Sequence, residues 1–123
     1  MAERARSGAW VAKGIHRTVW AGLTFATTDT GAPTKYHRLA DKNVTVRGTF
    51  GAGGSVVLEG SNDVTDPPTN WYTLQDVAGN AIALTAANPT EQVLQNTLWY
   101  RPRVTAGDGT TSLACELVAT GGD

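Results

Sequence analysis

The side chains that could do chemistry in this chain are few, and they do not form a catalytic group. A Ser/His/Asp triad needs a histidine base beside a nucleophile, and the 123 residues contain only two histidines, His16 and His37. No G-x-S-x-G elbow accompanies them, and no cysteine or carboxylate at ligand spacing makes them a zinc site. We therefore expect a protein that is not an enzyme and that has no cofactor and no metal.

One loop places several oxygen atoms close together in the sequence. Asn62, Asp63 and Asp66 lie within five residues, and Ca²⁺ prefers oxygen-rich loops of this kind. Asn and Asp are also common in turns because their side chains bond to nearby backbone, so a plain turn is the favoured interpretation. The single cysteine, Cys115, lies in the apolar run LACELVA and is expected to be a small buried residue.

Composition argues against several kinds of partner. The formal net charge is -1, so the chain as a whole has no electrostatic reason to bind nucleic acid. No window approaches the ~18 apolar residues of a membrane span, and the first residues lack the apolar core of a secretory signal. We expect one domain with no nucleic-acid and no membrane partner.

The elements that would position these side chains are short runs with a period of two, separated by Gly, Pro, Asn and Asp. Their number, about eight, predicts an all-β fold, an antiparallel β-sandwich of jelly-roll type. The expected strands are 17–27, 35–39, 44–50, 55–61, 71–75, 81–85, 99–104 and 111–119. The run from 91 to 98 could form one short helical turn.

The sequence pattern also predicts which strands pair and which side chains share a face of a strand. The glycine-rich segments 51–54 and 106–109 can supply the positive φ angles of tight hairpins, so each following strand should pair with the preceding one. In the first strand, Val19 and Leu23 are expected on one face and Trp20 on the other. Pro102 should mark an edge or a bulge, because proline cannot donate to a sheet.

The first 13 residues show neither helical nor strand periodicity. We expect an extended basic N-terminal arm at 1–13, a sandwich domain at 14–120 and a flexible tail at 121–123. Arg4, Arg6 and Trp10 are the candidate partner-binding residues of the arm. Two interpretations stay open: the arm docks on a partner or on a neighbouring subunit, or it is an unstructured solubilising tail.

The run WYRPRV offers a second candidate surface. If Leu98, Tyr100 and Val104 point inward, strand alternation turns Trp99, Arg101 and Arg103 outward together. An aromatic ring flanked by two guanidinium groups would suit an acidic groove on a partner. The other interpretation is that Trp99 covers a hydrophobic edge and that the arginines are merely solvated.

Two stretches carry a resemblance to known proteins. VLEGSNDVTDPPTNWYTLQD is similar to the strand, loop and strand of galactose-binding-like (discoidin-like) sandwiches. The order GTFGAGGSVVLEGSND, WYTLQDVAGNAIALTAA and YRPRVTAGDGTTSLACELVA resembles small virion structural proteins encoded near the capsid genes of tailed bacteriophages. This broader resemblance covers residues 44–119.

The resemblance implies a capsid decoration or cement protein that binds the major capsid protein and stabilises the shell. It further implies a homo-oligomer, a dimer or a trimer, on the outer capsid surface of the virion after synthesis in the host cytoplasm. Two alternatives stay open. One is a carbohydrate-binding module of a phage fibre that uses Asp63, Trp71 and Tyr72, although the loops lack the Arg and His cluster of sugar-binding relatives. The other is a head-tail joining or tail protein.

Overall fold

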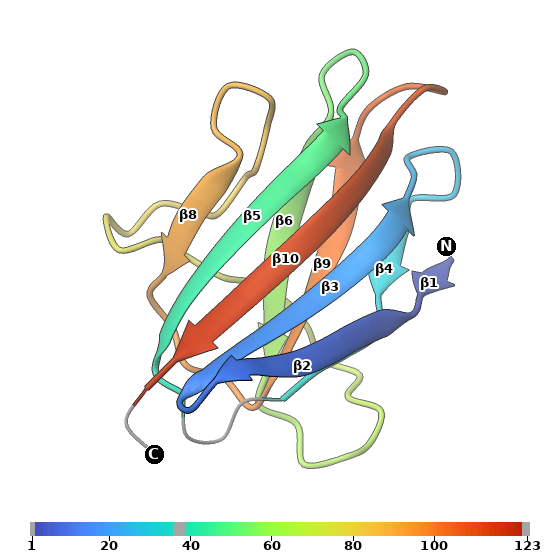
Figure 1. Cartoon of the computed structure of the whole chain (residues 1–123). Helices are drawn as coiled ribbons and strands as arrows, with labels where there is room; N and C mark the ends of the chain where they lie inside the picture. The colour runs from blue at the N-terminus through green and yellow to red at the C-terminus, as the bar shows by residue number, and fades with distance from the viewer. Residues whose placement is uncertain (1, 36–38, 122–123) are drawn as a thin grey trace.

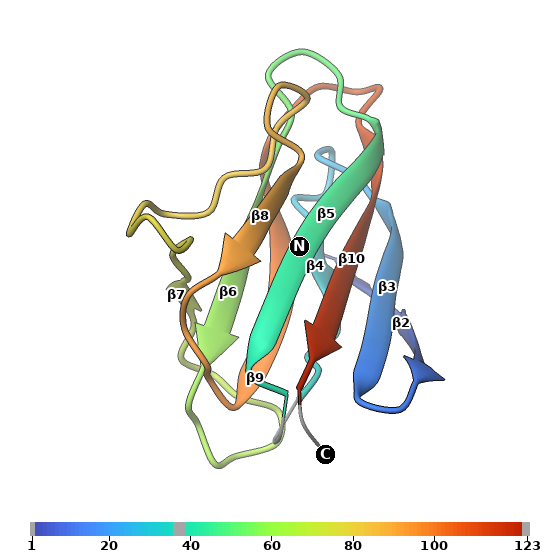
Figure 2. The same ribbon diagram turned by 60° about the vertical axis from the view of Figure 1, so that its left-hand side comes forward.

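The computed structural model describes residues 2–35 and 39–121, which form two five-stranded sheets packed face to face (Figure 1). The strands are β1 (Glu3–Arg4), β2 (Arg6–Ala12), β3 (Ile15–Leu23), β4 (Thr30–Gly31), β5 (Asp41–Thr49), β6 (Ser55–Ser61), β7 (Tyr72–Thr73), β8 (Thr90–Val93), β9 (Trp99–Ala106) and β10 (Ser112–Thr120). One sheet has the order β1-β4-β9-β6-β7 and the other β2-β3-β10-β5-β8. The turned view shows two layers with open edges, which confirms the expected all-β sandwich (Figure 2).

Apart from β1 and β2, the strands have the arrangement of a jelly roll. The last strand of the chain, β10, lies between β3 and β5, and β9 lies between β4 and β6. The connections from β3 to β4, β4 to β5, β5 to β6 and β9 to β10 all cross from one sheet to the other. Segments distant in sequence are therefore hydrogen-bonded neighbours, as Greek-key sandwiches require.

The two glycine-rich segments do not form the hairpins that we expected. Residues 51–54 connect β5 to β6 and residues 106–109 connect β9 to β10, and in both cases the two strands belong to different sheets. Gly51 and Gly53 do have positive φ angles, of 70° and 68°. The turn chemistry was therefore recognised correctly, but a local turn does not determine which sheet the next strand joins.

These two connections are tied to each other at one end of the sandwich. Asp108 accepts a hydrogen bond from the backbone N–H of Ala52 at 2.8 Å, and the Thr111 hydroxyl donates to the Phe50 carbonyl at 2.8 Å. Hydrogen bonds to the Asp108 carboxylate, first from the Thr110 side chain and then from Ala52, lower its pKa to about 2. The ionised carboxylate thus holds the two crossings together.

The alternation in β3 differs from the expected one. Trp20 is fully buried and donates from its indole nitrogen to the Ala32 carbonyl at 2.8 Å, whereas Val19 is only half-buried. A bulge inserts one extra residue between Trp20 and Leu23, where Gly22 has a φ of 72°. Both large side chains therefore reach the core, because a bulge breaks the period of two on which the expectation depended.

Other strands confirm the sequence pattern in part. Of the expected strands 44–50, 55–61, 99–104 and 111–119, all residues except 50 and 111 lie on strands, and the expected inward residues Leu113, Cys115 and Leu117 are buried. The run 91–98 contains no helical turn: residues 91–93 belong to β8 and residues 94–98 are irregular, while 81–85 makes only isolated bridges. The expected strand 35–39 and the tail 121–123 lie mostly outside the described residues.

Pro102 lies inside β9, between β4 and β6, and not at an edge or a bulge. The N–H groups of Tyr100 and Val104 bond to Thr34 and Asp29, so the missing donor of Pro102 faces the β4 side. Pairing there is sparse, because β4 is two residues long. Gly31 fits against the proline ring, since a Cβ at Gly31 would lie 2.6 Å from Pro102 Cδ. The missing N–H therefore interrupts a ladder that is already short.

Within the segment expected to be an extended arm, residues 3–4 and 6–12 form edge strands. β1 pairs in parallel with β4, and β2 pairs antiparallel with β3, so the segment adds one strand to each sheet. All seven residues of β2 are exposed. Backbone hydrogen bonds hold this strand and no core side chain marks it, which explains why hydrophobic periodicity did not reveal it.

Candidate functional site

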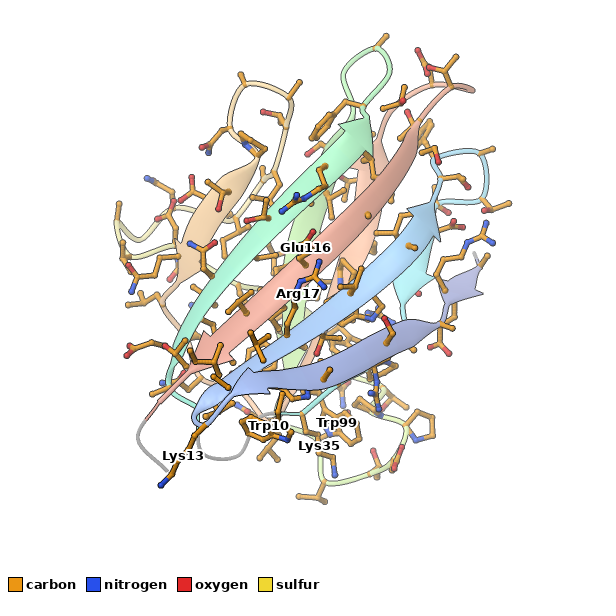
Figure 3. All side chains as sticks on the ribbon, viewed as in Figure 1. Trp10, Lys13, Arg17, Lys35, Trp99 and Glu116 are labelled. Atoms are coloured by element: carbon orange, nitrogen blue, oxygen red, sulfur yellow. The ribbon has the colours of Figure 1, made fainter. Side chains whose placement is uncertain are left out.

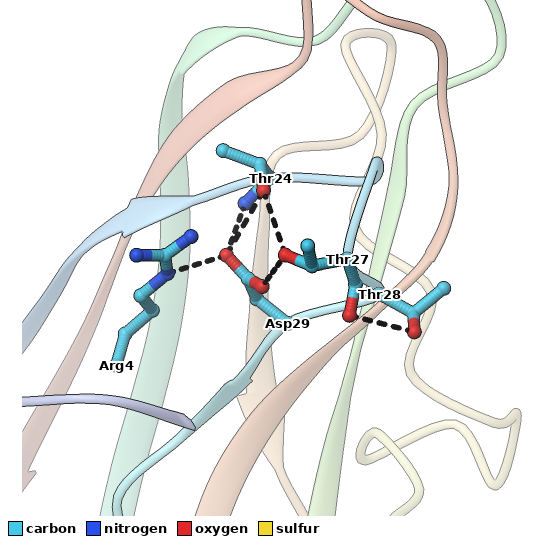
Figure 4. Close-up of polar contacts among 5 residues, drawn as sticks. All are labelled: Arg4, Thr24, Thr27, Thr28 and Asp29. Carbon is cyan, nitrogen blue, oxygen red and sulfur yellow. Dashed lines mark hydrogen bonds and ion pairs between the residues drawn. The ribbon is translucent and has the colours of Figure 1, made fainter. Parts of the chain in front are cut away.

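The six residues expected to bind a partner lie in three separate places, and the first of these is internal. Nε of Arg4 donates to Oδ2 of Asp29 at 2.6 Å, and Asp29 is fully buried (Figure 4). The same carboxylate accepts hydrogen bonds from the Thr24 backbone N–H at 2.8 Å and from the hydroxyl groups of Thr24 and Thr27. Burial alone would raise the pKa of Asp29, but these hydrogen bonds outweigh it and lower the pKa. The charge of Arg4 is therefore already balanced within the chain.

The second place is the outer face of the sheet that contains β9. Arg101 and Arg103 point outward as expected, but the Nε atom of each lies 2.9 Å from one oxygen of Glu59 on β6. The guanidinium of Arg101 also stacks on Trp71, 4.2 Å from the ring centroid. These cations are paired inside the chain, so they are not simply solvated and are not free for an acidic partner.

The other sheet repeats this arrangement. Glu116 on β10 is nearly buried and lies 3.2 Å from Arg17 and 2.9 Å from Arg47 (Figure 3). Each sheet thus carries one carboxylate between two arginines on its outer face. In both clusters the carboxylate and its arginines lie on neighbouring strands, so the ion pairs stabilise the pairing of those strands.

Trp99, at the start of β9, is covered by neighbouring segments and does not project into solvent. It is buried, its indole N–H donates to the Asp63 carbonyl at 3.0 Å, and Lys35 Nζ lies 4.3 Å from its ring centroid. Leu98, which we expected to point inward, is exposed. The loop 62–70 folds back over the tryptophan, a tertiary contact that strand alternation cannot predict.

The residues of the glycan-binding alternative are also engaged locally. Oδ2 of Asp63 accepts hydrogen bonds from the backbone N–H groups of Thr69 at 2.7 Å and Asn70 at 2.8 Å. These bonds, with that of Asn70 the largest, lower the pKa of Asp63. Asp63 therefore closes its own loop, as a turn aspartate does. Trp71 lies under Arg101, whereas Tyr72 is exposed.

The third place is a groove of about 590 Å³ beside β2. Its charged and aromatic lining comprises Glu3, Arg6, His16, Lys35, Asp66 and Trp99. Arg6 reaches across it and donates from Nε to the Pro33 carbonyl at 3.0 Å. Figure 3 shows Trp10, Lys35 and Trp99 gathered on the side of β2 where this groove lies.

Trp10 stands at the margin of the groove. Its ring meets that of His16 edge to face, with 5.0 Å between centroids, and the residue is 63% exposed. Burial, and after it the positive charge of Arg6, lowers the pKa of His16. The imidazole is therefore largely neutral at neutral pH. Two cations and two carboxylates thus line the groove with no large excess of either charge.

Sequence reasoning identified Arg6, Trp10 and Trp99 but missed the groove that brings them together. The lining comes from β1, β2, β3, the segment 33–35, the loop 62–70 and β9, and no local motif connects these segments.

Sequence reasoning also missed a buried ionisable residue. Lys42 is buried, donates to the Ala40 carbonyl at 2.9 Å and to the Asn96 side chain, and burial lowers its pKa.

Three carboxylates whose pKa values are lowered predict how stability depends on pH. Asp29, Asp63 and Asp108 each bind protons less readily in the folded chain than in the unfolded one. Their contribution is present above about pH 4 and is lost as the pH falls toward about 2. We expect the denaturation midpoint to fall steeply in this window in acid titrations followed by tryptophan fluorescence. Asp108→Asn should flatten the fall, and an unchanged slope would contradict the role of Asp108.

Comparison with known proteins gives no relative. The chain matches no protein-family model, no curated protein and no solved structure. In residues 2–35 and 39–121, no group of three or more His, Cys, Asp or Glu could hold a metal ion. The same residues include no helix long and apolar enough to cross a membrane. A function must therefore be argued from the groove and from the open edge of β2.

Proposed function

We propose that this chain is a non-catalytic assembly protein, and specifically a capsid decoration or cement protein of a tailed bacteriophage. It binds the major capsid protein on the outer shell and associates with itself. The observation that carries the proposal is β2, an edge strand exposed along its whole length. Trp10 and Val11 on this strand are each 63% exposed, Trp10 at the margin of the groove and Val11 on the other face, and large exposed apolar side chains on an edge strand mark an interaction site.

The groove supplies the polar part of the same surface. Lys35 and Asp66 line it from loops, and Arg6 lines it from β2. None of these three side chains has an ion-pair partner among the described residues. A mixed set of unpaired charges recognises a protein surface with the opposite pattern and gives specificity more than affinity.

Cementing does not require strong single contacts. An oligomer that touches several capsid subunits gains effective concentration for every contact after the first. The bacteriophage assignment depends on the sequence resemblance of residues 44–119, and the binding role depends on β2 and its groove. The exposed ring of Tyr72 is the one observation that favours the glycan-binding alternative.

We expect Lys35→Glu to weaken binding to capsids by about tenfold or more, because it reverses one unpaired charge in the groove. The measurement is co-sedimentation of the purified protein with heads that lack it, as a function of protein concentration. Lys13→Glu is the matched control, because it makes the same charge change in the exposed turn between β2 and β3, outside the groove lining.

Other outcomes separate the remaining candidates. If the wild-type protein never sediments with heads, the capsid role is wrong. Binding to a glycan that is lost in Tyr72→Ala would favour the fibre module. A few copies per purified virion would indicate a head-tail joining or tail protein, whereas a cement protein is present in many copies.

A further inference from the structure

Among the described residues, β2 is the longest strand at a sheet edge. The edge strands β1 and β7 have two residues each and β8 has four, whereas β2 has seven. An open edge presents unpaired backbone N–H and C=O groups, and monomeric proteins usually protect it with proline, charges, bulges or a covering segment. β2 contains no proline and only one charge, Arg6 at its end, and its one irregularity lies between Trp10 and Ala12, so the stretch from Arg6 to Trp10 is a regular open edge. It is the outermost strand of its sheet in both ribbon views (Figures 1 and 2).

The two faces of β2 differ in a regular way. A Cβ at Gly8 would lie 3.0 Å from the His16 ring, so position 8 faces the groove, and Trp10 contacts the same ring. Ser7, Ala9 and Val11 line a shallow depression with Arg17 and Val19 of β3 on the opposite face. From Arg6 to Trp10, every second position of β2 therefore faces the groove and the positions between them face away, up to the irregularity between Trp10 and Ala12.

We propose that β2 pairs antiparallel with β2 of a second copy about a two-fold axis at Ala9. The pairing joins the two five-stranded sheets that contain β2 into one continuous sheet across a dimer. This inference deepens the self-association in the proposed function and rests on that part of it. In this register Ala9 lies opposite Ala9, Gly8 opposite Trp10, Ser7 opposite Val11 and Arg6 opposite Ala12.

A second copy of the chain is the partner that suits the open edge of β2, for three reasons. The register centred on Ala9 brings all seven residues of β2 opposite one another, and the irregularity between Trp10 and Ala12 then lies beside Arg6 and Ser7 of the other copy. It places each exposed indole over the bare glycine of the other copy, a cross-strand contact that covers both. Finally, Arg6 faces an alanine, so like charges do not meet directly across the axis.

The axis position makes a cysteine test possible. Residues directly opposite in an antiparallel pair have Cα atoms roughly 4.5–5.5 Å apart, within the range that a disulfide spans. We expect Ala9→Cys to form a covalent dimer under mild oxidation on the order of tenfold faster than Val64→Cys. Val64 is 93% exposed in the loop 62–70 and is the control for random encounters, and the natural Cys115 is fully buried. Equal rates would overturn the register.

Charge at the axis gives a second test that does not depend on oxidation. Ala9→Lys and Ala9→Asp each place like charges on the two-fold axis, so each variant should be a monomer by light scattering. Ala9 is exposed, so the fold should be retained. A 1:1 mixture should recover the dimer, because lysine then faces aspartate. A Thr105→Lys control, exposed on β9, should remain dimeric.

The results distinguish this inference from the capsid role. A dimer that persists in Ala9→Lys would overturn the pairing through β2. A monomeric wild type would overturn the pairing and self-association together, while its co-sedimentation with heads would still support capsid binding. A dimer that is cross-linked at position 9 but never binds heads would support the pairing and contradict the capsid role.

Discussion

Asp29→Ala is expected to lower the free energy of unfolding by about 3–5 kcal/mol, as the loss of a buried charge partner does. The Asp29 carboxylate is fully buried and accepts hydrogen bonds from the Arg4 side chain, the Thr24 backbone N–H and two threonine hydroxyl groups. Without the carboxylate, these donors remain shielded from water but have no hydrogen-bond acceptor, and this destabilises the folded state. The backbone N–H of Thr24 has no rotational freedom to find another partner.

Matched variants separate the charge from the hydrogen bonds. Arg4 is 38% exposed, so Arg4→Ala should cost only about 1 kcal/mol, because water solvates and screens that side of the pair. Asp29→Asn keeps one carbonyl acceptor and should fall between the two. Urea denaturation of the three variants measures the differences. If Asp29→Ala cost no more than Arg4→Ala, the carboxylate would not organise the loop between β3 and β4.

The parts of the fold that could be predicted are the strands with one buried face. Val44 and Val46 on β5, and Leu113, Cys115 and Leu117 on β10, alternate with more polar residues and are buried. Burial of one face imposes a period of two on the sequence, so the pattern carries the information. β2 lacks a buried face and left no such pattern.

Connections and bulges could not be predicted for a different reason. The φ angles of Gly51 and Gly53 suit a turn, but the pairing partner of the next strand depends on contacts with β9, about fifty residues further along the chain. In β3 one extra residue at the Gly22 bulge moves Trp20 into the core. Both outcomes are set by tertiary packing, which overrides local propensity.

In the candidate site, too, features of a single strand could be predicted, whereas contacts between strands could not. The outward direction of Arg101 and Arg103 follows from alternation in one strand, whereas their partner Glu59 depends on the register between β6 and β9. Glu59 was visible as an acidic residue inside an apolar strand, which is a signal that a buried carboxylate has a partner. The groove offered no comparable signal, because several distant segments form it.

Glu59→Gln is the second large expected effect, a loss of about 2–3 kcal/mol. Its side chain is 7% exposed, and that of Arg101 is 16% exposed, so water replaces little of the lost charge. Arg101 and Arg103 would then lie side by side on one face without a counter-charge. Glutamine keeps the shape and one acceptor oxygen, so the loss reports the charge and not a cavity.

Glu116→Gln is the internal control for Glu59→Gln, because it has the same chemistry on the opposite sheet. Its partners Arg17 and Arg47 are 46% and 67% exposed, so solvent screens them and the expected cost is only about 1 kcal/mol. A double-mutant cycle between Glu59→Gln and Arg101→Gln should give a coupling of about 1–2 kcal/mol. Equal costs at the two sites would mean that burial of the arginines does not set the strength of these pairs. A larger cost at Glu59 is the expected result, because Arg101 and Arg103 are less exposed than Arg17 and Arg47.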